Sequence, residues 1–200
     1  MLNINLPGSG HTGPKNPAAM ALLGIGSDFL PFPDPLRPYL PDTSPETVAA
    51  IRDANNYTTI RAAMNYIERV IKNHAPCNEC FKKLPKHRTF KEIWESDTIW
   101  LNYMGDSSGM GETRGDFDIG ITLTCLKKGK MQIVATIVHE LAHIDGAPGR
   151  EQQAFADGKP NLMAESTLKC CLLAQYFDPG AIGVIDDAVF GESRPGNAAV

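Results

Sequence analysis

Residues 133–143 read Ile-Val-Ala-Thr-Ile-Val-His-Glu-Leu-Ala-His, an apolar run in which Glu140 is the one acidic residue. Such a run predicts a helix that is buried within a domain rather than one lying on its surface. His139 and His143 are four residues apart, so a helix places both imidazoles on one face, about one turn apart. That spacing suits a tetrahedral zinc ion, and Glu140 is then placed to take a proton from a water molecule. The competing interpretation is a core helix whose two histidines are only hydrogen bonded.

A third protein ligand has to come from the acidic residues downstream of the motif. The long HExxHxxGxxH pattern is excluded because Gly149 stands where its last histidine would be. The sequence predicts a second helix over 162–172 with Asn161 as its N-cap. On that helix Glu165 lies in line with apolar residues, where a carboxylate is costly unless it is paired or bound to a metal. We therefore expect Glu165 to be the third ligand.

Other assignments of the acidic residues stay open. Asp157 and Glu151 are of the right type for a third ligand and lie between the motif and the second helix. Glu165 itself could be a rim residue that reaches solvent. Asp145 follows the motif too closely to bind the same ion, so it either orients a ligand histidine or simply ends the helix.

The motif and the later glutamate together resemble the gluzincin branch of zinc metallopeptidases. The stretches 139–146, 164–170, 176–179 and 84–90 resemble, more narrowly, metallopeptidase toxin domains that occur with bacterial secretion systems, including type VI spike proteins. The resemblance implies an α+β, zincin-like fold: an active-site helix packed against a small antiparallel or mixed sheet, with a helical N-terminal half. It also implies one zinc ion, a peptide or protein substrate, a secretion-spike carrier and an immunity protein.

The oxyanion that forms during peptide hydrolysis needs a hydrogen-bond donor beyond these residues. Tyr176 is the first candidate because it continues the Glu165 side of the predicted helix. Tyr103 and His87 are the alternatives. Glu140 and Tyr176 are thus the expected catalytic residues, and His139, His143 and Glu165 the expected metal ligands.

Length and composition allow one ordinary globular domain. With 200 residues, 42% of them hydrophobic, the chain is long enough to bury a real core. A net charge of −4 without a basic stripe argues against nucleic acid as a partner. No apolar run is long enough to span a membrane, and the start has too weak a basic region for a Sec signal peptide. We expect secretion by a non-Sec route and action in the periplasm or cytosol of a target cell.

The predicted organisation is an extended arm over 1–43, rich in Pro and Gly, then one domain over 44–190, then a flexible tail over 191–200. Helices are predicted from Ser44 and over Thr58–Lys72. Strands are predicted over Thr98–Tyr103 and Phe117–Cys125, and segment 105–115 is expected to be a loop. In zincins the strand beside the motif helix pairs with the substrate backbone, a role that the resemblance gives to Phe117–Cys125.

Five cysteines leave the redox state of the chain open. Cys77 and Cys80 form a CxxC that predicts a local disulfide or two free thiols, and with His74 and His87 it makes a conceivable second zinc site. Cys171, adjacent to another cysteine on the second predicted helix, is expected in the core. The odd total leaves at least one thiol unpaired unless chains cross-link.

Three classes of function fit these observations. The first is a proteolytic effector with one zinc ion. The second is a hydrolase of peptidoglycan peptides that uses the same site. The third is a non-catalytic module stabilised by zinc, which would not need Glu140.

Overall fold

The computed structural model describes residues 1–6, 9–11, 32, 56–104, 109–148 and 163–176. These residues form helices around a small mixed sheet, which confirms the α+β class. The helical elements are α3 (Asn56–Tyr66), the π-helix η1 (Ile67–Ile71), α4 (Ala75–Phe81), α5 (Phe90–Trp94), α6 (Leu123–Lys127), α7 (Lys130–Ile144), α9 (Ala164–Cys170) and the 3-10 turn η3 (Ala174–Tyr176). The strands are β1 (Asn3–Ile4), β2 (Trp100–Tyr103), β3 (Gly111–Arg114) and β4 (Asp118–Ile121).

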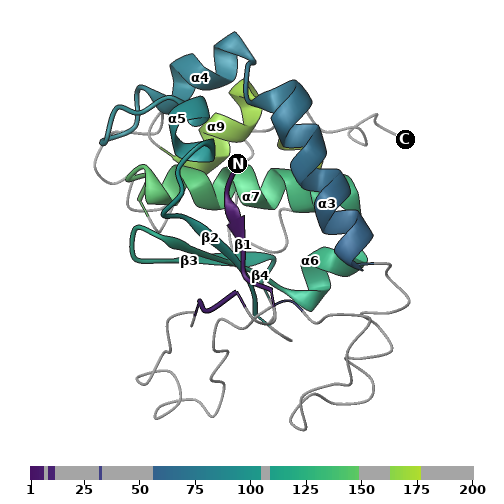
Figure 1. The fold of residues 1–200 in the computed structure, drawn as a ribbon. Coiled ribbons are helices and arrows are strands. Elements are labelled where there is room, and N and C mark those ends of the chain that lie inside the picture. The colour runs from purple at the N-terminus through teal and green to yellow at the C-terminus, as the bar shows by residue number, and fades with distance from the viewer. Residues whose placement is uncertain (7–8, 12–31, 33–55, 105–108, 149–162, 177–200) are drawn as a thin grey trace, which may run out of the picture.

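The HExxH motif lies on α7, which runs through the middle of the protein (Figure 1). The sheet lies along one side of α7, and the short helices α4, α5 and α9 lie along the other. Every α7 residue from Gln132 to Ile144 is buried except His143, which confirms the prediction of a buried helix. None of the described helices is both long enough and apolar enough to cross a membrane.

The sheet has the strand order β1-β2-β4-β3. β1 and β2 run parallel, as do β2 and β4, whereas β3 and β4 are antiparallel. The predicted strand Phe117–Cys125 corresponds to β4, whose two edges are both taken by neighbouring strands. The expectation that this strand offers a free edge to a substrate is therefore wrong. Among the described strands, the edge strand that contacts α7 is β3, and it lies in the segment 105–115 that was expected to be a loop.

The last part of the predicted strand Phe117–Cys125 is a helix instead, because α6 begins two residues after β4 ends. The cause is local. The Thr122 hydroxyl oxygen accepts a hydrogen bond of 3.1 Å from the backbone N–H of Cys125, which caps the first turn of α6. The alternation of residue types was misleading because Leu123 and Cys125 are also buried in the helix. Phe117, expected on the buried face, is 55% exposed.

The other predicted elements are present where the structure describes them. The second predicted helix, 162–172, is α9, but it spans Ala164–Cys170 and its N-cap is Met163, not Asn161. α3 and η1 together cover the predicted helix Thr58–Lys72, and its apolar stripe is buried at Ile60, Met64, Ile67 and Ile71. β2 lies within the predicted strand Thr98–Tyr103. The helix predicted from Ser44 lies outside the described residues.

The start of the expected N-terminal arm belongs to the sheet. Leu2 and Asn5 are buried, and the backbone N–H of Asn5 donates to the carbonyl oxygen of Leu101 at 2.9 Å. The Asn5 side-chain amide also donates to Oδ1 of Asn102 at 2.8 Å, within the sheet. Most of the remaining arm and the whole expected tail over 191–200 lie outside the described residues.

The cysteines are paired over long distances in the sequence. Disulfides join Cys77 to Cys171 and Cys80 to Cys170, bonding α4 to the end of α9. The three predictions for Cys77 and Cys80 are therefore wrong. These were a local disulfide between the two, two free thiols, and a zinc site shared with His74 and His87. Pairs 94 and 90 residues apart cannot be read from cysteine spacing. Cys125 carries the remaining thiol, and burial raises its pKa to about 12.

Candidate functional site

The two motif histidines face each other across one turn of α7. Nε2 of His139 lies 3.1 Å from Nε2 of His143, and the ring centroids are 4.7 Å apart with the planes at 84°. Two nitrogens bound to one tetrahedral zinc ion, each at about 2.0–2.1 Å, are roughly 3.3–3.4 Å apart. The histidine pair therefore has nearly the spacing that such an ion requires.

His143 is oriented by the turn that ends α7. Its Nδ1 lies 3.2 Å from the carbonyl oxygen of Ala147. A carbonyl oxygen only accepts hydrogen bonds, so Nδ1 carries the proton and Nε2 presents a lone pair toward His139. Gly146 makes this turn possible, because its φ is 96° and a Cβ there would lie 3.0 Å from Cβ of Pro85.

The same end of α7 is held by an arginine from the segment before α5. Nε of Arg88 donates to Oδ1 of Asp145 at 2.8 Å, and Nη2 of Arg88 donates to the carbonyl oxygen of Ile144 at 3.2 Å. Burial raises the pKa of Asp145, while the nearby guanidinium acts in the opposite direction. Of the two roles expected for Asp145, the structure supports the one at the helix end, since its carboxylate pairs with Arg88 and not with a ligand histidine.

Glu165 reaches the histidines from the first turn of α9. Its side chain is fully buried, and its Oε1 lies 3.6 Å from Nδ1 of His139. Burial, helped by the nearby His143, lowers the pKa of His139 well below its ordinary value. A neutral imidazole is the form that binds metal ions. The structure therefore brings together all three residues that the sequence suggested as ligands.

The residue types fit a zinc ion, but the three side chains do not converge on one point. In the described part of the chain, no group of three His, Cys, Asp or Glu side chains is arranged to hold a metal ion. The reason lies in the ring of His139, which meets Glu165 through Nδ1 and His143 through Nε2. For the carboxylate and both histidines to bind one ion, the side chain of Glu165 or of His139 has to change its conformation. The alternative ligands Asp157 and Glu151 lie outside the described residues.

Glu140 is held by the edge strand β3. The hydroxyl of Thr113 lies 2.7 Å from Oε2 of Glu140 and 3.0 Å from its backbone carbonyl oxygen, and it donates to this residue. Gly111, on the same face of β3, lets the strand come this close. A Cβ at Gly111 would lie 2.7 Å from Cγ2 of Thr136 and 3.0 Å from Oε1 of Glu140. The expected general base is therefore buried and oriented by a strand.

The supporting residues around the motif were missed by the sequence analysis. Thr113 and Gly111 lie in segment 105–115, whose glycines favoured a loop. The segment shows no sustained alternation of apolar and polar residues that would have predicted a strand. Arg88 lies in the stretch 84–90, which contributed to the family resemblance. No functional role was predicted for Arg88 itself. The backbone carbonyl of Ala147 leaves no signal in a sequence.

The three candidate oxyanion donors lie in different surroundings. Tyr176 ends η3, which packs against α7, and its side chain is 38% exposed. Tyr103 is buried at the end of β2. His87 lies on an exposed turn with its Nδ1 3.0 Å from the carbonyl oxygen of Lys82. No hydrogen bond between described residues joins Tyr176 or His87 to the motif, so their catalytic roles stay predictions.

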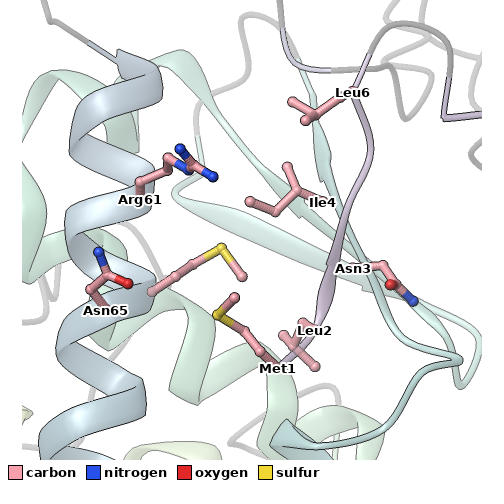
Figure 2. Close-up of a pocket in the computed structure, with 8 residues that line it drawn as sticks. Met1, Leu2, Asn3, Ile4, Leu6, Arg61 and Asn65 are labelled. Carbon is pink, nitrogen blue, oxygen red and sulfur yellow. The ribbon is translucent and has the colours of Figure 1, made fainter.

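A separate cavity of about 540 Å³ lies between the N-terminal strand and α3 (Figure 2). Residues 1–4 and Leu6 line one side, and Arg61, Met64 and Asn65 of α3 line the other. None of its lining residues is a His, Cys, Asp or Glu, so this cavity lacks the side chains for metal-dependent hydrolysis. The motif histidines and Glu140 belong to a different part of the fold.

We expect Thr113→Val to destabilise the protein by about 1 to 3 kcal/mol, because it removes a hydroxyl donor from a buried carboxylate and leaves the side-chain volume unchanged. The free energy of unfolding, measured by urea denaturation in the presence of a chelator, tests this. Thr113→Ser keeps the hydroxyl and is the matched control, with an expected loss of under about 1 kcal/mol. A loss in Thr113→Ser without a loss in Thr113→Val would mean that packing of the methyl group, and not the hydrogen bond, matters here.

The surroundings of the HExxH motif are thus a pair of closely spaced histidines, a buried glutamate from α9 and a second glutamate held by an edge strand. Comparison of the chain with protein-family models, with curated proteins and with solved structures gave no match. The function is therefore argued from the geometry of these side chains.

Proposed function

We propose that this chain is a zinc-dependent peptide-bond hydrolase with a zincin-like catalytic helix, α7. His139, His143 and Glu165 hold one zinc ion, and Glu140 is the general base. The observation that carries the proposal is the 3.1 Å approach of the two Nε2 atoms beside a buried, strand-held Glu140. A purely structural metal site needs no such base, which argues against the non-catalytic module.

Each residue of the proposed site has a separate task. Bound zinc would supply a Lewis acid that lowers the pKa of a water molecule toward 7. Glu140 takes a proton from the attacking water and passes it to the nitrogen of the leaving amine. Thr113 donates to Oε2 of Glu140 and so holds the carboxylate in one orientation beside the histidines. The Ala147 carbonyl keeps the proton of His143 on Nδ1 and its Nε2 available as a ligand.

An extended peptide substrate fits the edge strand β3. The face of β3 that carries Gly111 and Thr113 is turned toward α7, so the backbone of β3 comes close to Glu140. One edge of β3 is not paired with another described strand. Peptides commonly add to such an edge through backbone hydrogen bonds. The substrate strand is therefore β3 and not β4, and the scissile bond of a peptide paired with β3 would lie next to the motif.

The biological role that the sequence resemblance implies is a bacterial effector delivered by a secretion system into a target cell. A secretion spike as carrier and an immunity protein as inhibitor are the partners that this role implies. The two disulfides favour action in an oxidising compartment such as the periplasm, because a reducing cytosol does not preserve them. In the periplasm peptidoglycan peptides are also accessible, and a comparison of purified sacculi with casein as substrates separates the two kinds of hydrolase.

We expect the purified protein to contain about one equivalent of zinc, since the site supplies three ligands of the right types. Elemental analysis after dialysis against metal-free buffer, with the Glu140→Gln variant as a control that keeps the ligands, measures this. A folded preparation that holds no zinc and refuses added zinc would overturn the proposed function. Two equivalents would point to a second metal site in addition to this one.

A further inference from the structure

The helix that carries Glu165 is fastened to the rest of the protein by both disulfides. α9 has seven residues, and Cys170 and Cys171 stand at its end. Their partners, Cys80 and Cys77, lie three residues apart on α4, which also has seven residues. Helices this short are not stable alone in water, so tertiary contacts and cross-links must hold them in place.

Two bonds constrain α9 more than one bond would. A single disulfide leaves a pivot about which a short helix can turn, whereas bonds from two neighbouring residues to two positions on α4 restrict both its tilt and its rotation. Glu165 lies five residues before Cys170, about 7.5 Å along the helix axis at 1.5 Å per residue. A tilt of roughly 15° about the cross-links would then move Glu165 by about 2 Å, about the length of one zinc–oxygen bond.

We propose that the two disulfides form a redox clamp that keeps Glu165 beside His139, so that the metal site is complete in an oxidising compartment and weakened in a reducing one. The part of this proposal that concerns zinc rests on the proposed function. The part that concerns the position of α9 does not, because the disulfides and the contact between Glu165 and His139 are present without any ion.

Opening the clamp is a balanced thiol–disulfide exchange. A thiolate of a dithiol reductant attacks one sulfur of a protein disulfide, forms a mixed disulfide and releases one protein thiolate. The second thiol of the reductant then closes its own disulfide and releases the other protein cysteine. Each bridge thus takes up two electrons and two protons, and the two bridges yield four cysteine thiols.

The structure also gives an order for the two reductions. Cys77 and Cys171 are buried, with exposed fractions of 0% and 1%. Cys80 and Cys170 are partly exposed. Since exchange requires access to a sulfur atom, the Cys80–Cys170 bond is reduced first and the Cys77–Cys171 bond second. The outer bond sets the sensitivity of the clamp. Once it is reduced, the inner bond alone keeps α9 attached to α4, and α9 can turn about that single cross-link.

The test compares the oxidised full chain with the same protein reduced by a phosphine, which has no thiol to compete for zinc. The phosphine is oxidised with an oxygen atom from water, and each bridge becomes two thiols. Thiol titration in denaturant should rise from one to five, since the chain has five cysteines, of which Cys125 alone is unpaired. Hydrogen exchange of residues 164–170 in excess chelator reports the clamp, and chelator competition reports zinc affinity.

On reduction we expect at least tenfold faster amide exchange in α9, with exchange in α3 unchanged, and at least tenfold weaker zinc binding. Cys80→Ala/Cys170→Ala keeps only the inner bond, so its α9 exchange and its zinc affinity should lie between those of the oxidised and the fully reduced protein. A variant with all four cysteines changed to alanine should no longer respond to the phosphine. Exchange in α9 that is the same before and after reduction would overturn the clamp, as would a second equivalent of zinc taken up by the four thiols.

The two proposals fail in different ways. If zinc binds in neither state while α9 exchange still rises on reduction, the proposed function is lost and the clamp stands. If zinc binds equally in both states and α9 exchange does not change, the clamp is lost and the proposed function stands. The chelator-treated protein provides the exchange measurement in either case, so no outcome depends on turnover.

Discussion

Glu140→Gln is expected to lower peptide hydrolysis by about a hundredfold or more while zinc content and thermal stability stay unchanged. Glutamine has the same shape, and its amide oxygen can still accept the hydrogen bond of Thr113, so the packing against β3 is preserved. What it lacks is the ability to take a proton from water. The measurement is turnover of a casein or peptide substrate at saturating zinc, with metal content determined on the same preparation.

The matched control for Glu140→Gln is Glu112→Gln, which removes a carboxylate from β3 and keeps the carboxylate of Glu140 on α7. Glu112 pairs with Arg114, at 2.8 Å from its Nε, and its side chain is 42% exposed. We expect its turnover to remain within a few fold of the wild type. Turnover retained in Glu140→Gln would show that another group acts as the base and would remove the reason for assigning that role to this motif.

The second large effect is expected at Glu165, the proposed ligand from α9. Glu165→Ala should weaken zinc binding at least tenfold, measured by chelator competition, and should lower the melting temperature in zinc, because metal affinity is coupled to folding. Asp157→Ala and Glu151→Ala are the controls and should bind zinc normally. A loss in Asp157→Ala instead would move the site toward an aspartate ligand and away from α9.

Glu165→Gln distinguishes ligation from support. A neutral amide is a poor ligand for zinc, so a ligand glutamate should lose as much affinity on this change as on the change to alanine. If Glu165 only accepts a hydrogen bond from Nδ1 of His139, the amide oxygen can do the same and most of the affinity is kept. Oε1 of Glu165 lies 3.6 Å from Nδ1 of His139, whereas His143 approaches the other nitrogen of that ring, Nε2. The glutamine and alanine variants together therefore decide between ligation of zinc and support of His139.

The motif helix and the position of Glu165 could be predicted because both depend on local patterns. A buried helix follows from an apolar run of this length, and a carboxylate in an apolar stripe must have a partner inside the protein. The structure has both features, with α7 buried and Glu165 beside His139. Whether the three side chains bind zinc stays a prediction.

The parts that could not be predicted depend on contacts between distant residues. β3 pairs with the nearby strand β4 in a hairpin, but it also packs Gly111 against Thr136 of α7, which lies 25 residues further along the chain and cannot be read from the residue types of 105–115. The disulfides connect positions 90 or more residues apart. α6 shows the opposite failure, since a threonine cap outweighed an alternating pattern that looked like a strand.

The short strand β1 has a practical consequence for anyone who expresses this protein. It covers one side of β2, and removing residues 1–6 would bare a row of backbone N–H and C=O groups along that parallel strand. Open edges of this kind recruit strands from other molecules and lead to aggregation. A shortened chain intended for crystallisation should therefore keep β1, because its loss would expose β2 and favour aggregation.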